Sequence, residues 1–227
     1  MARTLDPEAH SLRRDAFMDV AQQLIQTRGY ERLSLQDILD ELGASKGAFY
    51  HYFATKEALF AALIDRTTEA AVATVIPIVD DPGLSAVDKM AGVFSGIARW
   101  KGERSELMLE VIRVWFSDDN VVVREQLRRS TAIRLTPLLT RIVRQGTLEG
   151  TFSCASPEGT ARVLISVMQG LNEVASELFI ARQAGTVSFE DVERTMAAYG
   201  EAYQRILGLQ SGSWAIPDQA TLRQWFA

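Results

Sequence analysis

Residues 34–53 decide the fold of this chain, and they read SLQDILDELGASKGAFYHYF. In the first half, leucine and isoleucine recur at helical spacing, at positions 35, 38, 39 and 42. This pattern predicts a short helix with one apolar face. Ser34 and Asp37 are spaced as a capping box at its start, and Gly43 is a typical helix terminator at its end. A tight Gly-Ala-Ser turn is therefore expected after this helix.

A second short helix follows the turn, because Ser45 can cap a segment that reaches Phe53. Phe49 and Phe53 are four residues apart and should point inward together. Thr55 can then cap a further helix that starts at Lys56. Two short helices on either side of a tight turn, braced by a longer helix before them, are typical of a helix-turn-helix, whose second helix can enter a DNA major groove.

Outward from this motif, the whole chain predicts helices and no strands, so the expected fold class is all-α. Helices are expected at 7–28, 85–101, 104–117, 121–145, 157–183 and 188–208, with a break at Pro82-Gly83. Pro137 should kink or break the 121–145 helix. The tail after Leu209 should leave the last helix, and its aromatic side chains (Trp214, Trp225 and Phe226) predict that it docks on the protein.

The chain has 227 residues, of which 47% are hydrophobic and 23% charged, as in an ordinary soluble globular protein. The single cysteine, Cys154, excludes an intrachain disulfide and fits a reducing compartment. The longest apolar run, Ala70 to Val79, is about half of the roughly 20 residues that span a bilayer. No signal peptide is visible, so we expect a cytoplasmic protein with no membrane partner.

The net charge of −5 argues by itself against nucleic-acid binding, because affinity for phosphates comes from lysine and arginine. The distribution of the charges changes this conclusion. Residues 42–56 contain no acidic side chain but include Lys46, His51 and Lys56. An acidic protein can bind DNA through a face that is free of carboxylates.

The outward side chains of the 45–53 helix have the chemistry of DNA recognition. Lys46 can donate to guanine, Ala48 can contact a thymine methyl group, and Gly47 lets the backbone approach base edges. Three adjacent ring side chains can donate to phosphates: Tyr50, His51 and Tyr52. Each of the three alone is better explained as an ordinary surface or core residue. Their grouping between two lysines, with no acid nearby, favours DNA contact.

The run from Gly29-Tyr30 through 34–38 and 43–53 to Lys56-Glu57-Ala58-Leu59 resembles the DNA-binding domain of the TetR family of bacterial transcriptional regulators, over residues 8–65. The resemblance implies an all-helical protein with a three-helix DNA-binding head and a C-terminal regulatory body. It also implies a homodimer on a palindromic operator, usually a repressor that a small-molecule effector releases. Leu39 departs from the family pattern, in which alanine is common at this position.

Carried over position by position, the resemblance implies four residues near DNA bases: Gln36, Lys46, Gly47 and Ala48. It implies six residues near phosphates: Ser34, Ser45, Tyr50, His51, Tyr52 and Lys56. The corresponding division of the chain is a helix-turn-helix DNA-binding domain at 1–56, a helical ligand-binding and dimerisation domain at 57–208 and a C-terminal tail at 209–227.

Two helices of the expected body carry apolar stripes that suit lengthwise packing against another helix. The 157–183 stripe includes Leu164, Met168, Leu171, Ala175 and Leu178, and the 188–208 stripe includes Val192, Met196, Tyr199 and Tyr203. From the residues alone, a dimer interface and an intrachain core explain these stripes equally well. The family resemblance favours the interface.

A ligand pocket in the body would need large apolar side chains. Six candidates meet this description: Phe94, Trp100, Met108, Trp115, Phe116 and Met168. Aromatic and methionine residues at helical spacing are more often core than pocket, so both interpretations stay open for each residue.

An enzyme is not expected, and neither is a metal or another cofactor. The chain has two histidines, too few for a histidine-rich metal site, and it lacks a glycine-rich phosphate loop and a nucleophile elbow. The alternative to a ligand-controlled repressor keeps the same fold but acts as an activator or co-regulator through a protein partner.

Overall fold

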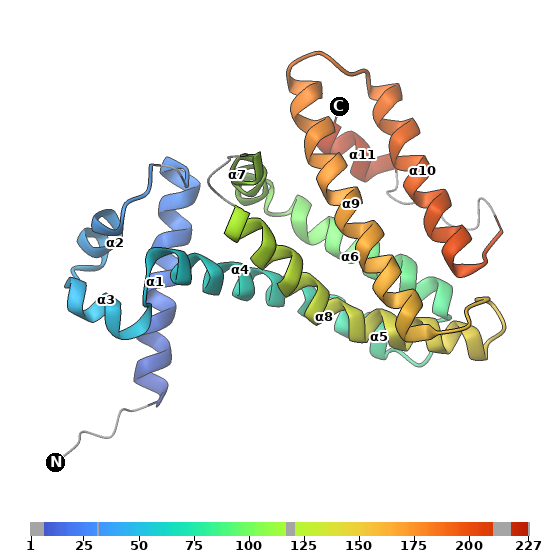
Figure 1. Ribbon diagram of the computed structural model, residues 1–227, viewed down its shortest axis with the longest axis horizontal. Helices are drawn as coiled ribbons and strands as arrows, with labels where there is room; N and C mark the ends of the chain where they lie inside the picture. Colours follow the sequence, from blue (N-terminus) through green and yellow to red (C-terminus); the bar gives the residue numbers. More distant parts are fainter. Residues whose placement is uncertain (1–6, 31, 117–120, 211–218, 227) are drawn as a thin grey trace. The chain divides into compact units, whose positions relative to one another are not determined.

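The computed structural model describes residues 7–30, 32–116, 121–210 and 219–226, and the described residues contain helices and no strands. The helices, labelled in Figure 1, are α1 (Pro7–Arg28), α2 (Leu35–Leu42), α3 (Lys46–Tyr52), α4 (Lys56–Ala73), α5 (Ile76–Asp80), α6 (Ala86–Gly102), α7 (Ser105–Phe116), α8 (Val121–Leu148), α9 (Pro157–Gln183), α10 (Phe189–Leu207) and α11 (Gln219–Phe226). The all-α class expected from the sequence is confirmed.

The chain forms two compact units. The first unit comprises Met1–Thr68 with Ser105–Leu127, and the second comprises Glu69–Arg104 with Arg128–Ala227. Because these boundaries fall inside α4 and α8, each of these two helices has residues in both units. The sequence-based division at residues 56 and 208 stays a prediction about function.

The core of the first unit is built by the helix-turn-helix and the helix before it. Phe49 and Phe53 are buried, as their spacing predicts, and Phe17 of α1 is fully buried beside them. The Phe17 and Phe49 rings meet edge to face, with 5.5 Å between their centroids. Leu59 and Phe60 bring the start of α4 into the same cluster. Burial of these large side chains fixes which face of α3 points outward.

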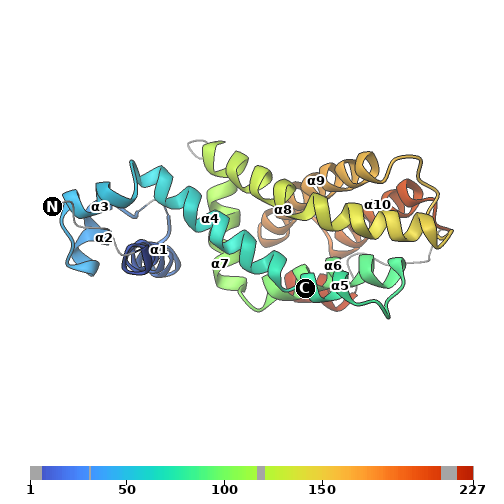
Figure 2. The same ribbon diagram turned by 90° about the horizontal axis from the view of Figure 1, so that it is seen from below.

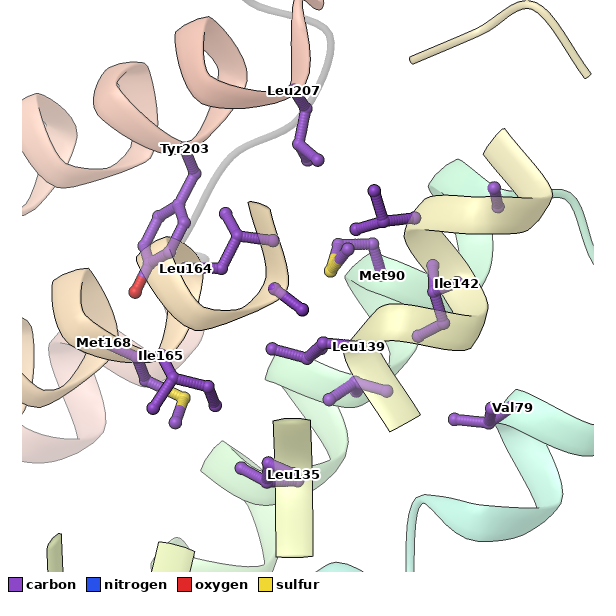
Figure 3. Close-up of a cluster of buried hydrophobic side chains, with 14 of the residues drawn as sticks. Val79, Met90, Leu135, Leu139, Ile142, Leu164, Ile165, Met168, Tyr203 and Leu207 are labelled. Carbon is purple, nitrogen blue, oxygen red and sulfur yellow. The ribbon is translucent and has the colours of Figure 1, made fainter. Parts of the chain in front are cut away.

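The second unit has its own core, which draws on α5, α6, α8, α9 and α10 (Figure 3). Leu135, Leu139 and Ile142 of α8 are at most 2% exposed. They pack with Met90 of α6 and Leu164 of α9. Figure 2 shows the short α5 beside α6. Near this contact, a Cβ atom on Gly96 would lie 2.9 Å from Val75 Cγ1, so a larger residue at this position would force one of the two to shift.

The helices differ from the prediction in three places. Pro137 does not break its helix, because α8 continues over 28 residues from Val121 to Leu148. The buried side chains on either side of the proline hold both halves of this helix in one core. The helices α5 and α11 were not expected, since α5 has only 5 residues and α11 lies in the tail, which was expected to leave the last helix.

The tail docks on the protein, as its aromatic residues predict. Leu222 and Phe226 of α11 are buried in a second cluster with Val192 and Met196 of α10. Arg182 Nε of α9 donates to the Phe226 carbonyl oxygen at 3.1 Å. Figure 1 shows α11 beside α9 and α10. Trp214 lies outside the described residues.

The two apolar stripes assigned from the sequence to a dimer interface pack within the single chain. Leu164, Met168 and Tyr203 belong to the core of the second unit. Val192 and Met196 are buried in the α10–α11 cluster, with Leu171, Ala175 and Leu178 packed against it. Tyr199 is partly buried and faces Gly170 across the α9–α10 contact. Packing within the chain therefore accounts for the buried residues of both stripes, and a dimer contact by the partly buried ones stays a prediction.

Helix α9 is long and apolar enough to cross a membrane by length and composition, with a mean hydropathy of 1.3, and core helices of soluble proteins meet the same criterion. Only 17% of the most apolar 18-residue segment of α9 is buried within the chain. Val163 and Ile180 on α9 are 49% and 41% exposed. This helix therefore retains apolar surface that the described chain does not cover.

Candidate nucleic-acid interface

The first short helix of the motif, α2, is held at both ends by the contacts that its sequence predicts. The Ser34 hydroxyl accepts from the Asp37 amide at 3.1 Å, and the Asp37 carboxylate accepts from the Ser34 amide at 2.8 Å. This capping box satisfies two backbone donors at the helix start. At the other end, Gly43 has a φ of 58°, a left-handed conformation that glycine adopts without strain.

The second short helix, α3, begins after the turn that Gly43 makes possible. The Ser45 hydroxyl accepts from the Ala48 amide at 3.1 Å, which confirms the predicted cap. Phe49 is fully buried, whereas the next residue, Tyr50, is 55% exposed. The buried phenylalanine fixes the rotation of α3 about its axis, so the face that carries Lys46, Gly47 and Tyr50 is held toward solvent.

Most of the predicted DNA contacts are on the solvent side of α2 and α3. Seven of the ten are exposed: Ser34, Gln36, Ser45, Lys46, Gly47, Tyr50 and His51. Ala48, Tyr52 and Lys56 are partly buried. Within the described part of the chain, Lys46 forms no hydrogen bond or ion pair. The Lys46 ammonium group is therefore available to an external acceptor.

Lys56 is engaged within the chain. Its ammonium group donates to the Leu33 carbonyl oxygen. It also lies 5.4 Å from the ring centroids of both Tyr30 and Phe60, within the range of cation–π attraction. Burial lowers the pKa of the Lys56 ammonium, and this effect exceeds the opposing influence of the Glu57 and Asp37 carboxylates. These contacts join α4 to the segment before α2, and a phosphate contact by Lys56 stays a prediction.

Gln36 and Tyr52 also have partners inside the first unit. The Gln36 amide donates to Asp40 Oδ1 at 2.7 Å, an interaction along the exposed side of α2. The Tyr52 ring lies 5.8 Å from the Phe17 ring and packs against the core. Tyr52 therefore contributes to holding α3 on α1 as well as to the surface beside His51.

His10 also belongs to this surface, although it is not among the residues predicted from the sequence to contact DNA. Its ring centroid lies 4.7 Å from the Tyr52 ring and 5.5 Å from the His51 ring. His10 precedes the buried Phe17 by seven residues, two helical turns, so both side chains occupy the same face of α1. This spacing is the signal that could have identified His10. No group of three or more metal-ligating side chains occurs among the described residues.

The structure places the side chains of four of the six candidate pocket residues, and the pocket itself stays a prediction. Phe94 packs against the core that contains Met168, and its ring lies 4.9 Å from the Tyr203 ring. Trp100 is buried apart from that core, with the Arg104 guanidinium 4.6 Å from its ring centroid. Met108 is on α7 in the first unit. The side chains of Trp115 and Phe116 lie outside the described part of the chain.

The capping box of α2 leads to a first prediction. Replacing Ser34 by alanine should lower the free energy of unfolding by about 1 kcal/mol, because the α2 start loses a cap. In the folded protein, hydrogen bonds from the Ser34 hydroxyl and amide, assisted by Arg28, lower the pKa of Asp37. A carboxylate whose pKa is lower in the folded than in the unfolded protein stabilises the fold at pH values above its pKa in the unfolded protein. This stabilisation is lost as the pH falls through its pKa in the folded protein. Urea denaturation at neutral and acidic pH should therefore show a smaller acid effect in Ser34→Ala.

The α10 start supplies a matched control, because Ser188 and Asp191 form the same capping box in the second unit. Ser188→Ala should lose similar stability and leave DNA affinity unchanged. Unchanged stability in Ser34→Ala would contradict the role of the α2 cap.

Comparison with known proteins identifies the segment that runs from α1 into α4. Residues 17–63 match the family described as bacterial regulatory proteins, tetR family. An uncharacterized HTH-type transcriptional regulator in the lacX 3' region of Lactococcus lactis subsp. lactis is 40% identical over 60 residues, 26% of this chain and 31% of that protein. The HTH-type transcriptional repressor ComR of Escherichia coli (strain K12) is 43% identical over 53 residues, 23% of this chain and 25% of ComR. These matches thus span about a third or less of each relative.

The fold likeness extends over most of the chain. The crystal structure of RolR in complex with resorcinol has a TM-score of 0.62 and 15% identity, and the alignment covers 96% of this chain and 94% of RolR. Solved TetR-family regulators share the fold with TM-scores of 0.61 and 0.55. Residues 17–63, which run from α1 into α4, thus match the tetR family of bacterial regulatory proteins, and the chain as a whole shares the fold of these solved structures.

Proposed function

We propose that this protein is a transcriptional repressor that binds a palindromic operator as a homodimer and responds to a small-molecule effector. The single observation that supports DNA recognition is that one face of α3 is anchored in the core while another face is exposed. Phe49 anchors this helix in the core, while Lys46, Gly47 and Tyr50 face solvent. A helix held in this way can insert its N-terminal residues into a major groove. The name of ComR, a transcriptional repressor, supports the repressor role.

The apolar surface of α9 supports the dimer. Val163 and Ile180 are exposed on a helix of which little is buried within one chain. Covering such a surface with a second copy would remove apolar area from water. A twofold dimer places two copies of α3 to read the two halves of a palindrome, about one DNA turn apart.

Control by a small molecule is proposed for the second unit. RolR, which has the same fold, was crystallised with resorcinol. In this chain α4 starts in the first unit at Lys56 and ends in the second at Ala73. An effector that displaces α4 would change the spacing of the two α3 helices, with a coupling of about 1–3 kcal/mol. We propose a cytoplasmic location, because the operator is there.

The proposal is tested by salt-dependent binding of the purified protein to the DNA that flanks its own gene. We expect affinity for a palindromic segment that exceeds affinity for randomised DNA by at least about a thousandfold and falls steeply with salt. Light scattering of the free protein and of the complex should give the mass of a dimer. Equal affinity for flanking and randomised DNA at every salt concentration would overturn specific regulation. Specific binding by a monomer would overturn the dimer alone.

A further inference from the structure

Two lysines of α6, Lys89 and Lys101, each donate a hydrogen bond to a side-chain amide on a neighbouring helix of the second unit. Lys89 Nζ donates to Gln145 Oε1 of α8 at 2.9 Å. Lys101 Nζ donates to Asn172 Oδ1 of α9, also at 2.9 Å. In both cases the acceptor is a neutral side-chain amide. The hydrogen bond therefore orients each ammonium group and leaves its positive charge to be balanced by another group.

The charge of Lys89 is balanced by Glu149. Gln145, which accepts from Lys89, donates through its own Nε2 to Glu149 Oε1 at 2.6 Å. Glu149 also accepts from the Ala86 amide at the start of α6, at 3.0 Å. Hydrogen bonds from Gln145 and Ala86, with a smaller influence of the Lys89 charge, lower the pKa of Glu149. Lys89 is thus part of a complete network of cation, amide and carboxylate.

Lys101 has the cation and the amide but no carboxylate among the described residues. Its whole-residue exposure is intermediate, while its ammonium end is surrounded by protein, and this burial lowers the pKa of the ammonium group. The next residue, Gly102, lies against Gln224 of α11, where an added Cβ atom would come within 2.7 Å of the Gln224 amide. A buried cation without an anionic partner is costly to a fold, so Lys101 would be stabilised by an anion that the described residues do not supply.

The surroundings indicate what kind of anion would fit. Lys101 supplies one positive charge, and two of its three N–H groups are not used by Asn172. The Asn172 amide nitrogen supplies further donors to a second oxygen atom. Ala175 and Phe179 follow Asn172 on the same face of α9 and are partly buried apolar residues. One charge, donors from two side chains and apolar neighbours match a monovalent carboxylate on an apolar body better than a phosphate dianion.

We propose that Lys101 and Asn172 bind the carboxylate of a small apolar acid, and that this acid is the effector. The effector part of this inference rests on the proposed function, because it assumes that the second unit controls DNA binding. The carboxylate accepts from Lys101 Nζ and Asn172 Nδ2 and supplies to Lys101 the negative charge that Glu149 supplies to Lys89.

The experiment compares two acids with their neutral amides on the full chain: benzoate with benzamide, and hexanoate with hexanamide. Titration calorimetry is expected to show binding of at least one acid, with its amide at least about tenfold weaker. Lys101→Met should lose the preference for acid over amide, whereas Lys89→Met should keep it. Without any acid, Lys101→Met should unfold at a higher temperature than wild type, because an uncompensated charge is gone. Lys89→Met should unfold at a lower temperature.

The outcomes separate the site from the proposed function. Failure of both acids to bind, equal affinity for acid and amide, or acid binding by Lys101→Met at wild-type affinity would each overturn the site. If Lys101→Met does not fold, Lys101→Gln replaces it in the same titration, because glutamine keeps an N–H donor and removes the charge. Acid binding that leaves operator affinity unchanged would overturn the effector role and keep the site. If the acid-free protein did not bind the operator, the proposed function as a regulator would be overturned. The calorimetric evidence for the acid site would be unaffected.

Discussion

Lys46→Glu is expected to abolish specific DNA binding and to leave the fold intact. Lys46 is the first residue of α3, it is exposed, and it makes no hydrogen bond or ion pair within the described chain. Loss of a base contact weakens binding by about 1–3 kcal/mol, and a new carboxylate adds repulsion from the phosphates. We therefore expect a loss of at least about a hundredfold in affinity for the operator. Fluorescence anisotropy with the flanking palindrome, together with circular dichroism of the free protein, measures both quantities.

Arg223→Glu is the matched control for Lys46→Glu. It makes the same change in net charge on an exposed residue of α11 in the second unit. Its effect on DNA affinity should be small. If Lys46→Glu retained wild-type affinity and specificity, α3 would not be the reading helix. The alternative of a regulator that acts through a protein partner would then be favoured.

Phe49→Ala is expected to have the largest effect on stability. The Phe49 side chain is fully buried, and its ring lies 5.5 Å from Phe17 and 5.7 Å from Phe53. Truncation of a buried phenylalanine removes transfer free energy and leaves a cavity, at a cost of about 3–5 kcal/mol. Because α3 is only seven residues long, it has little stability without this anchor. Urea denaturation and amide hydrogen exchange of the first unit should both report the loss, and DNA binding should disappear with it.

Leu12→Ala is the control for this truncation. Leu12 lies on α1 in the same unit but is 65% exposed, so its loss should change stability by less than about 0.5 kcal/mol. Equal destabilisation by the two variants would show that α3 does not depend on the Phe49 anchor. In that event the orientation of Lys46 and Tyr50 would need another explanation.

Local features of the reading motif were predictable from sequence because they depend on residues three or four positions apart. The caps at Ser34 and Ser45 and the terminator at Gly43 all involve near neighbours in the chain. The burial of Phe49 and Phe53 follows from helical periodicity in the same way. Short-range hydrogen bonds and the 3.6-residue helical repeat depend only on residues close together in the chain. Both can therefore be predicted from the amino-acid sequence without the rest of the fold.

Tertiary structure decided the features that join distant residues. It showed that Lys56 donates to Leu33, that His10 lies beside His51, and that the α9 and α10 stripes pack within one chain. It also brought Lys101 to Asn172, 71 residues later.

An apolar stripe shows that a helix face must be covered, and a lysine shows that a charge must be solvated or paired. Neither reveals its partner, because many arrangements of the helices satisfy the same local pattern. Sequence alone thus determined the all-α class and the local form of the reading motif. Long-range packing selects the arrangement of helices that buries the most apolar surface, and it decided which charged side chains are paired and which stay exposed.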